Sequence, residues 1–292
     1  MYELNQVGKS TYYIQSPAKI GLYRVNDAAV ILIDSGNDKD AGRKVRQVLD
    51  KQGWTPQAIL NTHSNADHIG GNRYLQAQYG CPIFANGVEA ALTRYPQLEP
   101  AFLWGGYPVN ELRHKFLLAQ PSDAKDFSDP AYPAALEAIP LPGHFFDMVG
   151  FRTPDDVVFL ADCVSSEATL TKYGVTFIYD VAAYLRTLDA VEAMQAACFV
   201  PAHAEAAADM KALVRVNRQK VLEIGEHLLA CCRTPALFED ILQATFTRYG
   251  LSMDFSQYVL VGSTVRSYLS WLKETDRLDV CFANNRMLWQ CK

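Results

Sequence analysis

The stretch from residue 61 to residue 72, N-T-H-S-N-A-D-H-I-G-G-N, brings together side chains that can bind a metal ion. These side chains are His63, Asn65, Asp67 and His68. Imidazole nitrogens and carboxylate oxygens are the donors that divalent transition metals prefer. The apolar run 58–60 before them predicts a buried strand, and the apolar spacing of Tyr74, Leu75 and Tyr79 after them predicts a short helix. We therefore expect the donors on a turn between a strand and a helix, where side chains are accessible.

Histidine and aspartate residues also follow apolar runs later in the chain, and each of those runs predicts a strand. The three segments are Pro142-Gly143-His144, Phe159-Leu160-Ala161-Asp162 and Pro201-Ala202-His203. A bound divalent metal lowers the pKa of water from about 15.7 toward 7 and polarises a carbonyl or phosphoryl oxygen. The sequence has neither the G-x-S-x-G motif of serine hydrolases nor a G-x-x-x-x-G-K-[ST] phosphate loop. A metal is thus the only catalyst that the sequence predicts.

Taken together, these motifs resemble those of the metallo-β-lactamase superfamily of metal-dependent hydrolases. T-H-S-N-A-D-H resembles the signature T-H-x-H-x-D-H, with Asn65 in place of the second histidine. L-I-D-S-G at 32–36, P-G-H, F-L-A-D and P-A-H resemble the other family phrases, in the family's order, and F-L-A-D is similar to the F-x-G-D of glyoxalase-II-like and lactonase-like members. The resemblance covers roughly residues 12–205. It implies a four-layer αββα sandwich and hydrolysis of a small ester, thioester or lactone.

The resemblance also implies a set of ligands. His63 and His144, with Asp162, would hold a first metal, and Asp67, His68 and His203, again with Asp162, would hold a second. Asn65 occupies a ligand position, but an amide oxygen is a weaker donor than imidazole and suits harder ions. Three outcomes stay open, namely an intact pair of ions, one ion in the second position, or a degenerate site. We expect one or two ions of zinc, iron or manganese.

Three residues are predicted to act in catalysis, and one to support a ligand. Asp67 is a predicted catalytic residue as well as a ligand, and Tyr173 and Tyr179 follow Asp162 in a region where related enzymes contact substrate. Either tyrosine is suited to donate a hydrogen bond to an oxyanion. Asp34 is interpreted either as support for the metal ligands or as a turn-capping residue.

The composition limits the possible partners and the compartment. The 292 residues are 49% hydrophobic and 20% charged, with a net charge of −5, so the chain has no general attraction to nucleic acid or anionic lipid. The first residues lack a basic segment followed by an apolar one, and no apolar stretch is long enough to span a bilayer. Seven cysteines without a C-x-x-C pair favour a reducing, cytoplasmic setting.

The strands and helices expected from the sequence divide the chain into two regions. Residues 1–205 form the predicted catalytic domain, with strands at 11–14, 20–25 and 29–33, a helix at 41–49, and a hairpin turn at Asn26-Asp27. Residues 96–133 form an insertion rich in proline and aromatic residues, which is either a wall or lid of the active site or a surface embellishment.

Residues 206–292 predict helices at 206–233, 235–249 and 263–274 followed by a hairpin, which resembles a winged-helix appendage. Residues 205–292 contain 11 Lys or Arg against 10 Asp or Glu, so this is not a basic face for phosphate. Packing or homodimerisation is therefore favoured over nucleic-acid binding.

Rival functions differ from a small-molecule hydrolase in what they require. A phosphodiesterase or nuclease would need more positive charge than the chain carries. An iron-dependent oxygenase or redox protein on the same fold would be distinguished by its iron content and electronic spectrum. A non-catalytic ligand-binding protein with a degenerate site would purify without stoichiometric metal.

Overall fold

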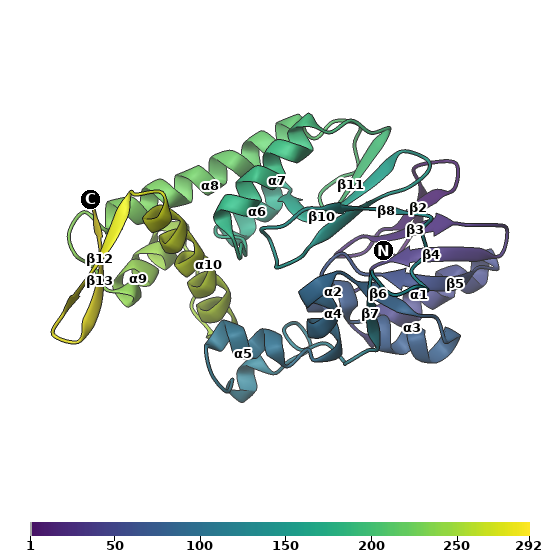
Figure 1. Ribbon diagram of the computed structural model, residues 1–292, viewed down its shortest axis with the longest axis horizontal. Helices are drawn as coiled ribbons and strands as arrows, with labels where there is room; N and C mark the ends of the chain where they lie inside the picture. Colours follow the sequence, from purple (N-terminus) through teal and green to yellow (C-terminus); the bar gives the residue numbers. More distant parts are fainter. Residues whose placement is uncertain (1) are drawn as a thin grey trace.

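The computed structural model describes residues 2–292 and shows two β-sheets packed face to face between layers of helices (Figure 1). The seven-stranded first sheet has the order β1-β2-β3-β4-β5-β6-β7, and the four-stranded second sheet has the order β11-β10-β9-β8. This is the predicted four-layer sandwich.

The strands of the first sheet change from antiparallel to parallel at β4. They are β1 (Leu4–Gln6), β2 (Thr11–Ile14), β3 (Ile20–Arg24), β4 (Ala29–Ile33), β5 (Thr55–Leu60), β6 (Ile83–Ala85) and β7 (Ala124–Asp126). In the second sheet, β10 pairs parallel with β11 and antiparallel with β9. Its strands are β8 (Glu137–Pro140), β9 (Val149–Arg152), β10 (Val157–Ser165) and β11 (Cys198–His203).

Helices cover the outer face of each sheet. Those that precede the second sheet are α1 (Lys39–Gln52), α2 (Ala66–Ile69), α3 (Asn72–Tyr79), α4 (Gly87–Arg94), α5 (Leu98–Trp104) and the 3-10 turn η1 (Asn110–Leu112). Those that follow are α6 (Glu167–Tyr173), α7 (Val181–Ala193), α8 (Lys211–Cys231), α9 (Phe238–Tyr249) and α10 (Phe255–Glu274). The chain ends in a hairpin of β12 (Leu278–Ala283) and β13 (Arg286–Cys291).

Separate hydrophobic clusters join the layers. One packs α1 and α3 on the first sheet, and a second fills the space between the sheets. Every residue of β4 is buried, as expected for a strand that is covered on both faces. The third and largest cluster joins the second sheet to α7, α8, α9 and α10. The loops that carry the predicted ligands therefore leave strands whose positions are fixed from both sides.

The predicted strands and helices occur in the predicted order, with shifts at their ends. The hairpin turn at Asn26-Asp27 joins β3 to β4 as predicted. The last helix begins at Phe255 rather than Ser263, because the Asp254 carboxylate caps it by accepting from the Gln257 backbone N–H. That first turn packs against α5, so its apolar residues did not show the spacing of a single buried face. Strands β1 and β9 and helices α5, α6 and α7 lie in segments for which no element was predicted.

The predicted insertion is partly folded into the sandwich. Residues 124–126 add β7 to the edge of the first sheet. Helix α5 instead packs on α10, where Leu103 and Val259 are buried together and Trp104 lies against Phe255 and Tyr258 (Figure 1). The boundary between the two predicted domains at 205/206 stays a prediction.

Helix α10 also contacts the segment that follows α6. The Thr264 hydroxyl accepts a hydrogen bond from the Ile178 backbone N–H at 3.3 Å, and Phe177 packs in the same cluster as α5 and α10. Helix α5 and the segment that follows α6 are distant in sequence, and both therefore pack on α10. None of the helices in residues 2–292 combines the length and the hydropathy that a membrane crossing requires.

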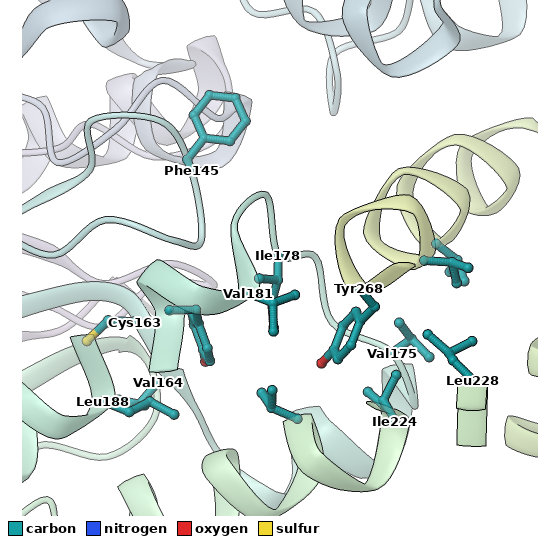
Figure 2. Close-up of a cluster of buried hydrophobic side chains, with 14 of the residues drawn as sticks. Phe145, Cys163, Val164, Val175, Ile178, Val181, Leu188, Ile224, Leu228 and Tyr268 are labelled. Carbon is teal, nitrogen blue, oxygen red and sulfur yellow. The ribbon is translucent and has the colours of Figure 1, made fainter. Parts of the chain in front are cut away.

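The buried hydroxyl of Tyr268 gives a prediction about stability. This side chain is fully buried among apolar groups that include Val175, Ile224 and Leu228 (Figure 2), and its hydroxyl has no hydrogen-bond partner within residues 2–292. A buried polar group without a partner costs about 1–3 kcal/mol. We expect Tyr268→Phe to raise the free energy of unfolding by about 1 kcal/mol in chemical denaturation.

The matched control is Tyr184→Phe in the same cluster. The Tyr184 hydroxyl donates to Asn217 Oδ1 at 3.4 Å, so its removal should lower the free energy of unfolding. Destabilisation of the same size by both substitutions would contradict the assignment of Tyr268 as unpartnered.

Candidate metal centre

The structure brings six of the seven predicted ligands together at the edge where β5, β10 and β11 lead into loops. They form two groups whose donor atoms lie within 4.8 Å of one another. The first group is His63, His144 and Asp162, and the second group is Asp67, His68, Asp162 and His203. Asp162 belongs to both, as the resemblance implied. The assignment of these residues as ligands is a proposal that the geometry supports.

Each of the four imidazoles has its Nδ1 atom beside an oxygen outside the two groups. The oxygens are Thr62 Oγ1 for His63 (3.0 Å), Asp34 Oδ2 for His68 (2.8 Å), the Phe177 carbonyl for His144 (3.0 Å) and the Pro17 carbonyl for His203 (3.0 Å). A carbonyl or carboxylate oxygen accepts only, so Nδ1 of the last three histidines carries the proton. The Nε2 lone pairs of those histidines are therefore free to face the site.

The same conclusion holds for His63 through Thr62 and Asp34. The Thr62 hydroxyl donates its proton to Asp34 Oδ2 at 2.8 Å, so its oxygen can only accept from His63 Nδ1–H. Asp34 also accepts from the Thr62 backbone N–H at 2.8 Å. Its backbone lies in the left-handed region, with φ of 64°, which aspartate tolerates better than most residues. Asp34 therefore orients two ligands, which favours the support role over a simple turn cap.

The inner face of the site contains polar atoms that lack partners. Within residues 2–292, His63 Nε2, His68 Nε2 and Asp162 Oδ1 are buried without a hydrogen bond. His68 Nε2 and Asp162 Oδ1 lie 3.1 Å apart, but not in the alignment of a hydrogen bond. Buried polar atoms normally have partners, and a divalent cation would satisfy all three at once. The donor set thus fits a metal.

The charges of the site lead to the same conclusion. Burial would raise the pKa of the Asp162 carboxyl, but His203 and His68 hold it well below its usual range. In turn, the negative charge of Asp162 raises the pKa of His203 to about 10, against the effect of burial. The carboxylates therefore need positive charge nearby. A divalent cation would supply that charge and leave the imidazoles neutral, as metal ligands must be.

An irregularity in β10 directs Asp162 into the site. The register between β10 and β11 shifts on both sides of Ala161, and Ala161 has a φ of 49°. Positive φ is strained for alanine, and β-bulges of this kind re-aim a side chain. The family phrase F-x-G-D has glycine at this position, whereas this chain has alanine, which is less suited to a positive φ.

Asn65 lies in the first group, where the missing histidine would be. Its Oδ1 atom is 3.1 Å from His144 Nε2, and its Nδ2 atom donates to Glu99 Oε1 at 2.8 Å. Because His144 Nδ1 carries the proton, Oδ1 and Nε2 are two acceptors that face each other. Burial also lowers the pKa of His144, which favours the neutral form. Two acceptors that face each other repel unless a cation binds between them. The structure therefore supports Asn65 as a ligand.

Two buried carboxylates behind the metal motif were not predicted from the sequence. Glu89 on α4 accepts from Ser64 N–H (2.9 Å), Ser64 Oγ–H (2.6 Å) and Asp147 N–H (2.9 Å). It thereby ties the loop of His63 to the loop of His144, and burial raises its pKa to about 7. Glu99 on α5 accepts the hydrogen bond from Asn65 Nδ2. Burial raises the pKa of the Glu99 carboxyl well above its usual range. No local pattern marks either residue, because their partners are distant in sequence.

Of the predicted catalytic residues, Asp67 lies on the exposed side of the site. The Asp67 side chain is 38% exposed and that of His203 is 25% exposed, whereas His63 and His68 are fully buried. Tyr179 is attached to the His144 loop, because its backbone N–H donates to the Gly143 carbonyl, and its ring packs on Phe146. The Tyr173 hydroxyl accepts from Lys172 Nζ at 3.2 Å. In residues 2–292 neither tyrosine hydroxyl bonds to a predicted ligand, so their catalytic role stays a prediction.

A cavity of about 590 Å³ lies elsewhere, between α1, α3 and residues 115–120. It is lined by Lys39, Arg73, Tyr74 and Lys115 among others, and it contains none of the predicted ligands.

Comparison with known proteins identifies a family and several relatives that match parts of this chain. The family model described as the metallo-beta-lactamase superfamily matches residues 15–203. A protein named Probable metallo-hydrolase from Bacillus subtilis is 26% identical over 156 residues, which span 52% of this chain and 66% of that protein. A Hydroxyacylglutathione hydrolase from a Bradyrhizobium strain is 41% identical over 61 residues, or 21% of this chain and 24% of that protein. The chain thus matches less than two thirds of the length of these relatives.

Two solved structures share the fold over nearly the full length. A beta-lactamase domain protein from Burkholderia ambifaria has a TM-score of 0.75 at 15% identity and covers 99% of this chain and 94% of its own. A metallo-beta-lactamase family protein from Thermus thermophilus has a TM-score of 0.74 at 17% identity, with coverage of 97% and 99%. At these identities the likeness concerns the fold alone. It includes the C-terminal region, because the alignments extend beyond the matched residues 15–203.

The hydrogen bonds of Asp34 give a prediction about metal affinity. Asp34→Asn keeps the shape and tolerates the left-handed backbone, but its single amide oxygen cannot accept both from the Thr62 backbone N–H on one side and from His68 Nδ1–H on the other. Loss of such a supporting partner commonly weakens metal binding ~10–100-fold. We expect this loss in a competitive Zn²⁺ titration, with little change in the far-ultraviolet circular dichroism.

The matched control is Asp40→Asn, because Asp40 is exposed on α1 and, among the residues that the structure describes, forms a salt bridge only with Arg43. It should bind Zn²⁺ like the wild type. Equal affinity in Asp34→Asn and Asp40→Asn would show that Asp34 does not support the ligands.

Proposed function

The chain belongs to the metallo-β-lactamase superfamily, and from that premise we propose that it hydrolyses a small ester, thioester or lactone with the help of one or two divalent metal ions. The observation that carries the proposal is the arrangement of the four imidazoles. Each donates Nδ1–H outward and leaves Nε2 for the site that Asp162 shares. Oriented imidazole nitrogens and a carboxylate are the kinds of donor that catalytic metal sites use.

The chain's own residues have separate tasks in this proposal. A bound divalent metal would polarise the scissile carbonyl and lower the pKa of the attacking water. His63, His144 and Asn65 would hold the ion of the first group, and His68, His203 and Asp67 that of the second. Asp67 is partly exposed, so its Oδ2 is placed to accept the proton of the water that attacks. Tyr179 and Tyr173 are the proposed donors to the oxyanion of the substrate.

The choice of substrate class follows from the relatives and the charge. Several relatives have the name hydroxyacylglutathione hydrolase, which supports hydroxyacylglutathiones as the first compounds to assay. The match covers only 24% of the first of them, so other esters and lactones belong in the same panel. A nuclease is not favoured, because the net charge is −5 and residues 205–292 are nearly neutral.

The second group provides the test of this function. We expect His203→Ala to lose bound metal and hydrolytic activity while the protein stays folded, because His203 lies at the open side and is not part of the core. His68→Ala should lose metal as well, but with some loss of stability, because His68 is fully buried. Elemental analysis of the purified proteins, followed by a panel of thioesters, esters and lactones, measures both effects.

His114→Ala is the matched control, because His114 lies in the insertion and bonds to Ser256 instead of the site. It should retain metal. Unchanged metal content in both His68→Ala and His203→Ala would refute the site, and wild-type protein without metal or activity would refute the function.

A further inference from the structure

The insertion reaches the metal motif through one side chain. Glu99 lies on α5, is 5% exposed, and accepts from Asn65 Nδ2 at 2.8 Å. Asn65 Nδ2 is the only hydrogen-bond donor to the Glu99 side chain within residues 2–292, and no lysine or arginine there pairs with it. A carboxylate buried with a single neutral partner contributes little to folding, because its desolvation is poorly compensated. Its position therefore calls for another explanation.

A comparison with Glu89 shows how different the two carboxylates are. Glu89 accepts three hydrogen bonds, of which two come from backbone N–H groups, and it joins two loops. That is the pattern of a structural carboxylate. Glu99 bonds to a side chain instead, and that side chain is the one residue of the motif whose orientation is ambiguous.

The ambiguity arises because the two ends of an amide are opposite in character. With Oδ1 directed inward, Asn65 adds an oxygen donor beside His144 Nε2, 3.1 Å away. In the reverse orientation, Nδ2 would donate to His144 Nε2 and occupy the lone pair that a metal needs. Glu99 Oε1 accepts from Asn65 Nδ2 at 2.8 Å, and this hydrogen bond holds Nδ2 on the outer side and leaves Oδ1 on the inner side.

We propose that Glu99 is a positioning residue that makes Asn65 an oxygen ligand of the first group, so that this chain replaces an imidazole by an amide and a carboxylate supplied from its insertion. The inference rests on the proposed function, because it assumes that the site binds metal. It deepens that function by giving the insertion a task in metal binding. It also explains why α5 must be held at a fixed distance from the motif.

Competitive titration with Zn²⁺ and a chromophoric chelator tests the proposal without an activity assay. Wild type should bind two ions with separate affinities. Glu99→Leu should weaken the affinity of one ion ~10–100-fold and leave the other unchanged. Glu99→Gln should weaken it less, because a glutamine can accept from Nδ2 but can equally donate to Oδ1. A loss of structure alone would not spare one of the two ions or be rescued by glutamine.

The controls separate the contact from general effects. Glu111→Gln makes the same chemical change at an exposed position of the insertion and should bind both ions like the wild type. Thermal unfolding of each variant identifies any that are not folded. In an Asn65→Ala background, where the amide is already absent, Glu99→Gln should cause no further loss of affinity.

Two results would overturn the proposal while leaving the function intact. One is equal binding of both ions by the wild type and by folded Glu99→Leu and Glu99→Gln. The other is a full effect of Glu99→Gln in the Asn65→Ala background, because Glu99 would then act on the site without the amide. A wild type that binds no Zn²⁺ would overturn the proposed function and this inference together.

Discussion

The outward hydrogen bonds of the four histidines are the constraint on which the site depends. Each Nδ1–H has an oxygen to donate to, and that single proton determines which nitrogen of the ring faces inward. The acceptors come from very different places, including the carbonyls of Pro17 and Phe177 and the carboxylate of Asp34. Both sheets and the segment before α7 must be in position before all four can be satisfied. The fold is therefore needed to fix the direction of the lone pairs and not merely to bring the histidines near one another.

The proposed ligands could be recognised in the sequence because each lies in a short phrase that resembles a family motif, within or close to the end of a strand. His63, His144, Asp162 and His203 were found in this way, and the structure brings them together. Secondary structure was predictable for the same reason, since most strands and helices are marked by apolar periodicity and by turns. The C-terminal helices and the hairpin were recognisable even without a substrate or partner to explain them.

What holds the ligands could not be predicted, because it depends on contacts between distant segments. Glu89 and Glu99 lie in ordinary helical sequence, and only the packing of α4 and α5 against the motif gives them a role. The Phe177 and Pro17 carbonyls carry no side-chain signal at all. The bulge at Ala161 was hidden as well, since an alanine in a strand gives no indication of a positive φ. The two alternatives for the insertion stay predictions; in the structure Glu99 contacts Asn65 and Trp104 packs on α10.

Because of the contacts of helix α10, the two groups of proposed metal ligands form at different stages of protein synthesis. The groups that orient Asn65 and His144 lie on α5 and on the segment around Phe177, and both rest on α10. The second group is formed by β10, β11 and the metal motif, with the acceptors Asp34 and Pro17, all of which precede residue 204. As the chain leaves the ribosome, the second group can assemble while α10 has still to be made. The first group can acquire its final geometry only when the last long helix is complete, so the end of the chain sets the time at which the centre matures.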